Sequence, residues 1–136
     1  MWAGTMTRRS EGPSEHQIQK AVFQWLRAVH PKIVAYAIPN AARRSAAQAA
    51  YLKAEGLRAG MPDIVIARPC GGFHGLYIEL KTKTGRISDV QKQMLFALAA
   101  EDYACAVARS VDEAINLITT YLEGRWNELL QSVTKH

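Results

Sequence analysis

The sequence has few cysteines and no long apolar segment, and both shortages exclude classes of protein. Its two cysteines, Cys70 and Cys105, stand in no pattern of metal ligands, and nothing requires them to form a disulfide. We therefore expect no zinc site and a reducing, cytoplasmic location. No apolar run approaches the roughly 18 residues of a membrane span, and the first nine residues lack the apolar region of a signal peptide. We expect no membrane partner.

Acidic residues are scarce in one segment of the chain. The whole sequence has 17 Lys and Arg against 12 Asp and Glu, which gives a net charge of +5. Residues 40–92 contain nine basic and four acidic residues, so the entire excess of positive charge lies in that segment. The alternative is that these cations only solvate helix faces. A segregated basic surface favours a nucleic acid as the partner.

The length and composition suit one globular domain. A chain of 136 residues with 49% hydrophobic and 21% charged residues can bury one core but not comfortably two. Residues 1–13 show no periodicity and are expected to be a disordered leader. The folded domain is expected over residues 14–123, and residues 124–136 are expected to form an amphipathic helix or a tail.

Helix and strand signals alternate along the chain, which predicts an α/β domain. Ser14 and Gln17 form a capping box at the start of an apolar stripe that ends near His30. The alanine-rich residues 41–55 predict a surface helix ended by Gly56. Further helices are expected from Ser88 and over 110–122, and strands over 32–38, 60–66, 75–81 and 103–108.

Two of these helices carry expectations about burial. In the alanine-rich helix, Tyr51 and Leu52 are expected to contact the core rather than to stack on bases. In the helix that begins at Ser88, one apolar face is expected to pack inward, formed by Val90, Met94, Leu95 and Leu98.

The central stretch predicts a β-hairpin with an acidic end. Turn-forming residues separate the two apolar runs Gly60–Ile66 and Gly75–Lys81. Because side chains alternate along a strand, Glu79 and Lys81 share a face, and Asp63 on the first strand can lie across from Glu79. Paired carboxylates suit a hard cation such as Mg²⁺. The alternative is an ordinary solvated ion cluster.

The residues around this hairpin resemble those of a known family. Pro62-Asp63 followed by Glu79-Leu80-Lys81 resembles the PD-(D/E)XK nuclease signature, and the neighbouring residues are similar to the VRR-NUC family. The family's name-giving Val-Arg-Arg tripeptide is absent, and Ala67-Arg68 is the nearest match. The further matching pieces, which occur in the family's order from about Ser14 to Leu122, are Glu15, Ile38–Asn40, Gly56–Asp63, Tyr77–Lys81 and Ser88–Gln91.

The resemblance implies a PD-(D/E)XK nuclease-like core, a central mixed sheet of about four strands flanked by helices. It also implies a Mg²⁺ or Mn²⁺ site held by Asp63, Glu79 and the backbone carbonyl of Leu80, with Glu15 bound directly or through water. Lys81 would position or deprotonate the attacking water, with Gln91 beside it. From the residues alone, a carboxylate that stabilises a helix N-terminus is the favoured interpretation of Glu15, and Gln91 suits a helix cap or solvent contact equally well.

For short standalone members of the family, the resemblance implies endonuclease activity on structured DNA such as four-way junctions or flaps, and a homodimer. A stripe formed by Trp126, Leu129, Leu130 and Val133 either pairs two chains or packs on its own sheet. A non-catalytic nucleic-acid-binding module and a nuclease acting on RNA remain alternatives. The residues expected to contact DNA are Asn40, Arg43, Arg44, Lys53, Arg58, Lys83 and Arg86.

Overall fold

A computed structural model describes residues 12–39 and 45–134 of the chain. In chain order the elements are α1 (Glu15–Val29), β1 (Ala35–Ala37), α2 (Ala46–Ala54), β2 (Ile64–Ile66), β3 (Leu76–Leu80), α3 (Asp89–Ala100), β4 (Ala104–Ala108), α4 (Val111–Leu122) and α5 (Trp126–Thr134). Most of the expected leader, and the expected DNA contacts Asn40, Arg43 and Arg44, lie outside the described residues.

The four strands form one mixed sheet in the order β1-β2-β3-β4. The β1–β2 and β2–β3 pairs are antiparallel, and β4 runs parallel to β3. The chain passes from β3 to β4 through α3, because two adjacent parallel strands need a crossover connection. The β2–β3 pair is the expected hairpin, with Ile64 opposite Ile78. The predicted α/β fold with a mixed sheet of about four strands is confirmed.

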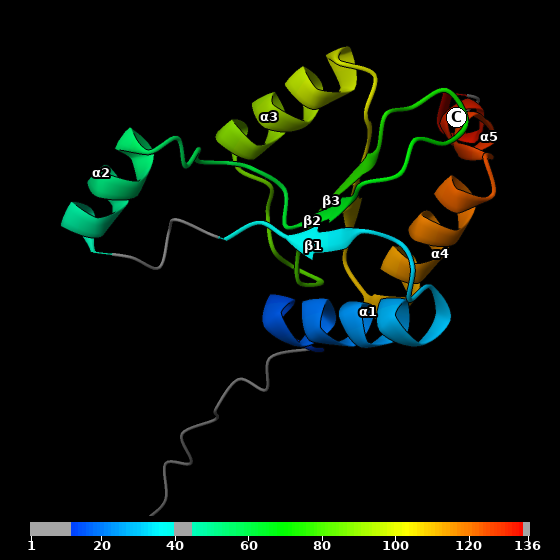
Figure 1. Cartoon of the computed structure of the whole chain (residues 1–136), viewed down its shortest axis with the longest axis horizontal. Helices are drawn as coiled ribbons and strands as arrows, with labels where there is room; N and C mark the ends of the chain where they lie inside the picture. Colours follow the sequence, from blue (N-terminus) through cyan, green and yellow to red (C-terminus); the bar gives the residue numbers. More distant parts are fainter. Residues whose placement is uncertain (1–11, 40–44, 135–136) are drawn as a thin grey trace, which may run out of the picture.

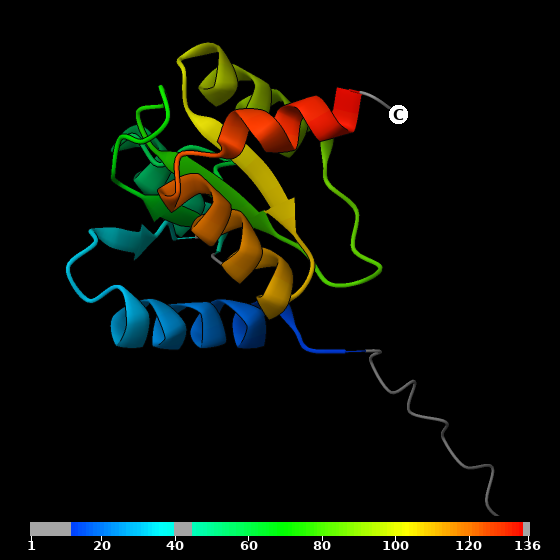
Figure 2. The same cartoon turned by 90° about the vertical axis from the view of Figure 1, so that its right-hand side faces the viewer.

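The core lies on one face of the sheet. Leu76, Ile78 and Leu80 alternate along β3 and are fully buried on this face. α1 and α4 cover them with apolar side chains that include Ile18 and Ile118. In Figure 1 the sheet lies between α1 and α3, and Figure 2 shows α4 running from α1 toward the start of α5. α1 is thereby fixed along one side of the sheet.

The first three helices begin with the same local motif. In each Ser-x-x-Gln box the serine hydroxyl accepts from the glutamine backbone N–H, and the glutamine side chain accepts from the serine backbone N–H. The capping box expected at Ser14 is therefore confirmed. The three boxes are Ser14–Gln17, Ser45–Gln48 and Ser88–Gln91.

The structure corrects three expectations from the sequence. β1 covers only Ala35–Ala37, because residues 31–33 form the turn that follows α1. Tyr51 is 68% exposed, since α2 has no buried residue and projects away from the sheet (Figure 1). Val90 is 50% exposed because it lies in the first turn of α3, whereas Met94 on the same helix is buried as expected.

The C-terminal segment is a helix, and its first residue belongs to the core. Trp126 is 2% exposed, and its ring lies edge-on to Tyr121 of α4 at 6.1 Å between centroids. Leu129 is half-buried against the same core, whereas Leu130 is 47% exposed. Part of the expected apolar stripe therefore packs back on its own chain. None of the helices that the structure describes is both long and apolar enough to cross a membrane.

Candidate functional site

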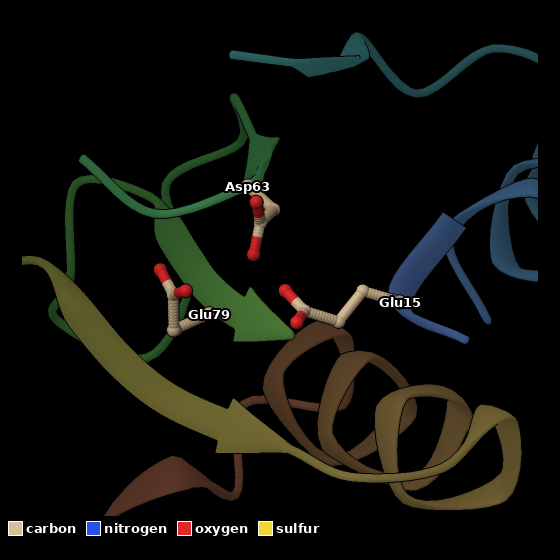
Figure 3. Close-up of side chains that lie close together, drawn as sticks. All are labelled: Glu15, Asp63 and Glu79. Carbon is tan, nitrogen blue, oxygen red and sulfur yellow. The ribbon is translucent and has the colours of Figure 1, made fainter. Parts of the chain in front are cut away.

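Three carboxylates from three distant parts of the chain meet at one end of the sheet. Asp63 immediately precedes β2, Glu79 lies in β3, and Glu15 lies in the first turn of α1. One oxygen of each carboxylate lies within 4.8 Å of those of the other two. Figure 3 shows the three side chains directed toward a common point. The predicted proximity of Asp63 and Glu79 is confirmed, and Glu15 joins them.

The hairpin fixes Asp63 through the backbone of β3. The N–H of Asp63 donates to the carbonyl of Ile78 at 3.0 Å, and its Oδ2 accepts from the N–H of Leu80 at 2.7 Å. A short loop around Gly60 leads into this position. Gly60 has a φ of +80°, and a Cβ placed there would lie 2.6 Å from the side chain of Val90. A side chain at this position would therefore displace either the loop that carries Asp63 or the start of α3.

Glu79 is the most enclosed of the three carboxylates. It is 2% exposed, and its Oε1 accepts a hydrogen bond from Gln91 Nε2 at 3.0 Å and lies 3.6 Å from Lys81 Nζ. Its Oε2 is buried and has no hydrogen-bond partner within the part of the chain that the structure describes. Buried oxygens normally have a partner. An unpartnered carboxylate oxygen beside two further carboxylates fits the all-oxygen ligand set of Mg²⁺ or Mn²⁺.

The environment of the cluster opposes full ionisation when no cation is bound. Burial is the main cause that raises the pKa of Glu79 to about 8, and the nearby charge of Asp63 adds to it. The ammonium of Lys81 acts in the opposite direction and does not prevail. Burial also raises the pKa of Asp63, although its hydrogen bond from Leu80 opposes the shift. The cluster therefore retains a proton at neutral pH that a divalent cation would displace.

Gln91 has two hydrogen-bond roles at once. Its backbone N–H and side-chain oxygen complete the capping box with Ser88, and its Nε2 donates to Glu79. The sequence left a helix cap and a place in the site as alternatives for this residue. The structure combines them, because the cap fixes the side chain in the position from which its amide reaches the carboxylate.

The loop after β3 is held by a residue that the sequence did not single out. Arg109 follows β4, and its Nη1 donates to the carbonyls of Thr82 and Gly85 at 2.9 and 2.6 Å. Lys81 is anchored at the start of this loop by its N–H, which donates to Ala108 at 3.0 Å. The sequence gave no local signal for Arg109, because its partners are backbone groups more than 20 residues away.

The expected DNA contacts that are described lie outside the carboxylate cluster. Lys53 is on α2, Arg58 follows that helix, and Lys83 and Arg86 lie in the loop after β3. All four side chains are exposed. Among the described residues, no ion pair joins these side chains to the carboxylates, so their role in binding DNA stays a prediction. The same holds for the backbone carbonyl of Leu80 as a metal ligand.

Comparisons with known proteins agree with this arrangement. The model of the VRR-NUC domain family matches residues 9–112, which is most of the chain. A solved structure described as a VRR_NUC domain protein superposes with a TM-score of 0.73 at 29% sequence identity, over 83% of this chain and 91% of the other. The comparison with curated proteins gave no match. The fold is thus of the nuclease type, and the chain belongs to the VRR-NUC domain family.

Proposed function

We propose that this protein is a divalent-metal-dependent endonuclease that hydrolyses phosphodiester bonds in structured DNA, such as four-way junctions or flaps. One observation carries the proposal. Three carboxylates lie within 4.8 Å of one another, and the buried Oε2 of Glu79 has no partner among the described residues.

The two free cysteines, Cys70 and Cys105, fit a reducing cytoplasm.

Asp63, Glu79 and Glu15 would hold Mg²⁺ or Mn²⁺, and the carbonyl of Leu80 is a further candidate ligand. When bound, such a cation neutralises charge that develops on a phosphate and lowers the pKa of a coordinated water. The chain's own contribution is to fix the three carboxylates before the substrate arrives. Asp63 is held by the backbone of β3, and Glu79 is held by the amide of Gln91.

Lys81 is the residue that would act on the attacking water or on the phosphate. Its side chain is 11% exposed, and its Nζ lies 3.6 Å from Glu79 Oε1. An ammonium held at this position can orient a water for attack and can stabilise negative charge on the phosphate oxygens. The hydrogen bond from Gln91 holds Glu79 Oε1 in the position where it faces Lys81 Nζ.

DNA would approach over exposed basic residues, which include Arg58, Lys83 and Arg86. Such cations supply sequence-independent contacts to phosphates. Asn40, Arg43, Arg44 and Lys53 complete the proposed set. A coordinated cut of both strands of a junction needs two sites, so we propose a homodimer, in which a two-fold axis matches that of the substrate.

Cleavage of a substrate panel tests this function. The panel contains single strand, duplex, flap, four-way junction and RNA, each with Mg²⁺, Mn²⁺ or EDTA. We expect cleavage of branched DNA with either metal and none with EDTA. Cleavage of RNA alone would change the substrate class. Binding of DNA without cleavage under any metal would make the protein a non-catalytic binding module.

Matched variants separate the roles within the site. Asp63→Asn and Glu79→Gln should abolish both cleavage and metal affinity, whereas Lys81→Ala should keep metal affinity and lose about two to four orders of magnitude in rate. Glu101→Gln, which neutralises an exposed carboxylate at the end of α3, is the control and should cut like the unmutated protein. Near-normal cleavage by the first three variants would show that the site is elsewhere.

A further inference from the structure

A groove with a volume of about 510 Å³ lies between α1 and β1, and the proposed chemistry does not use it. His16, Lys20, Phe23 and Arg27 line its helical side. They recur at intervals of three or four residues, so they share one face of α1. The opposite side is the strand Ala35–Ala37.

One end of the groove is formed by residues that neighbour the carboxylate cluster. His16 follows Glu15 in the first turn of α1. On the other side, Ala37 is followed by Ile38, whose N–H donates to the carbonyl of Asp63 at 2.9 Å. The far end is the turn between α1 and β1, near His30 and Pro31. The lining residues from His16 to His30 span about 21 Å along α1, and the residues next to Glu15 and Asp63 are at one end of this span.

The lining of the groove favours a polyanion. Lys20 and Arg27 are both exposed, and His16 and His30 add imidazole groups. Within the part of the chain that the structure describes, no carboxylate lines the groove. Phe23 and Ile33 give it an apolar floor. Basic side chains combined with an aromatic surface are the features that bind single-stranded nucleic acid, because phosphates and bases are contacted together.

The strand side of the groove adds backbone donors. β1 is the edge strand of the sheet. Val34 and Ile38 use their backbone groups to pair with β2. Pairing alternates along an antiparallel strand, so Ala35 and Ala37 direct their N–H and C=O groups to the open edge. Their methyl side chains leave these groups accessible to phosphate oxygens or base edges.

We propose that the α1–β1 groove binds a single strand of DNA beside the phosphate that is cut, so that the preferred substrate carries a single-stranded arm. This rests on the nuclease function proposed above and specifies its substrate. The groove's volume of about 510 Å³ is far too small for a double helix. A second copy of this chain is disfavoured as the occupant, because pairing the same face of two copies would bring Lys20 and Arg27 of both copies together.

Binding without cleavage gives a test that does not depend on catalysis. Fluorescence anisotropy in EDTA would compare blunt duplex, single strand and duplex with a single-stranded arm. In the double variant Lys20→Ala/Arg27→Ala, affinity for the two substrates with unpaired nucleotides should fall at least about tenfold, and the log–log salt dependence should flatten by about 1.4 units. Affinity for blunt duplex should change by less than about twofold.

The matched control is Arg125→Ala. It removes one positive charge between α4 and α5, where Arg125 pairs with Glu123 and Glu128 on the surface, and it should leave affinity for all three substrates unchanged. An equal loss on blunt duplex, no loss on the arm-bearing substrate, or a shift only in the oligomeric state would overturn the groove proposal. So would the absence of any affinity of the unmutated protein for the arm-bearing substrate.

Cleavage with Mn²⁺, measured in parallel, separates this proposal from the proposed function. If the unmutated protein cuts DNA but the double variant binds and cuts normally, the groove proposal alone fails. If the double variant loses affinity for the single-stranded arm while the unmutated protein cuts nothing, the groove proposal stands and hydrolysis fails. Loss of arm affinity together with a raised KM and a nearly unchanged kcat is the result expected when both hold.

Discussion

The side chain of Glu79 is 2% exposed and carries an unpartnered buried oxygen, so its negative charge is costly in the folded protein. Burial and Asp63 raise the pKa of Glu79 from 4.5 to about 8. The native state therefore binds a proton more tightly than the unfolded chain. The stability that this proton provides is fully present below about pH 4.5 and is lost as the pH rises toward about 8.

The loss of stability as the pH rises leads to the first prediction. In EDTA, Glu79→Gln should be more stable than the unmutated protein near pH 8, by on the order of 2 kcal/mol, because an uncharged amide occupies the same enclosed position. The difference between the two proteins should shrink as the pH falls toward 5. Thermal unfolding from pH 5 to 9 measures it. A difference that is the same at every pH would contradict the raised pKa.

Metal should reverse the order of stability at high pH. Mg²⁺ or Mn²⁺ binds the folded unmutated protein, so its melting temperature should rise, and the rise should be larger at pH 8 than at pH 6, where the cation must displace a proton. Glu79→Gln should show little of this increase. Equal metal-induced shifts for both proteins would place the cation elsewhere.

Arg109 supports the third residue-scale prediction. Arg109→Ala removes two hydrogen bonds to the loop that begins at Lys81, so it should lower kcat about tenfold or more with a small change in KM. Arg109→Lys keeps the charge but replaces the planar guanidinium, whose Nη1 donates both hydrogen bonds, and should recover only part of the rate. A loss of melting temperature with an unchanged kcat would show that Arg109 stabilises the loop without positioning Lys81.

At the scale of the element, α5 is attached to the core mainly through Trp126, with Leu129 half-buried beside it. Trp126 packs against Tyr121, whose hydroxyl donates to the carbonyl of Arg68 at the start of the β2–β3 loop. Trp126→Ala should destabilise the fold by about 3 kcal/mol or more, since it leaves a cavity beneath α5. Denaturant unfolding measures this loss. Leu130→Ala, on the exposed side of the same helix, is the control and should cost much less.

The elements also show what the sequence could and could not predict. Asp63 and Glu79 belong to one hairpin, so strand alternation was sufficient to place them together. Glu15 was placed in the site only through the family resemblance, because its approach depends on packing between α1 and the sheet. Arg109 and the α1–β1 groove were missed for the same reason. The prediction that Val90 is buried was wrong, because apolar periodicity alone does not show which turns of a helix are covered by the rest of the fold.

At the scale of the whole molecule, the proposed homodimer needs a contact surface between the two copies. Part of the C-terminal stripe is already used, since Trp126 and Leu129 pack on their own chain. We therefore expect two copies to meet through another surface. Sedimentation equilibrium at micromolar concentration should give a species of twice the 15.1 kDa chain mass, free and with junction DNA. A 15.1 kDa species in both conditions would rule out the dimer.

The shared role of Gln91 links the end of a helix to the occupancy of the site. Its amide restrains Glu79 only while the first turn of α3 is wound, because the Ser88 box holds the side chain in place. Opening of that turn removes the restraint and loosens the carboxylate. A cation bound through Glu79 stabilises the hydrogen-bonded first turn of α3. Amide hydrogen exchange at the start of α3, far along the chain from Glu15, should therefore slow. Binding of the cation thereby changes the rate of local opening of α3, a helix that supplies no metal ligand.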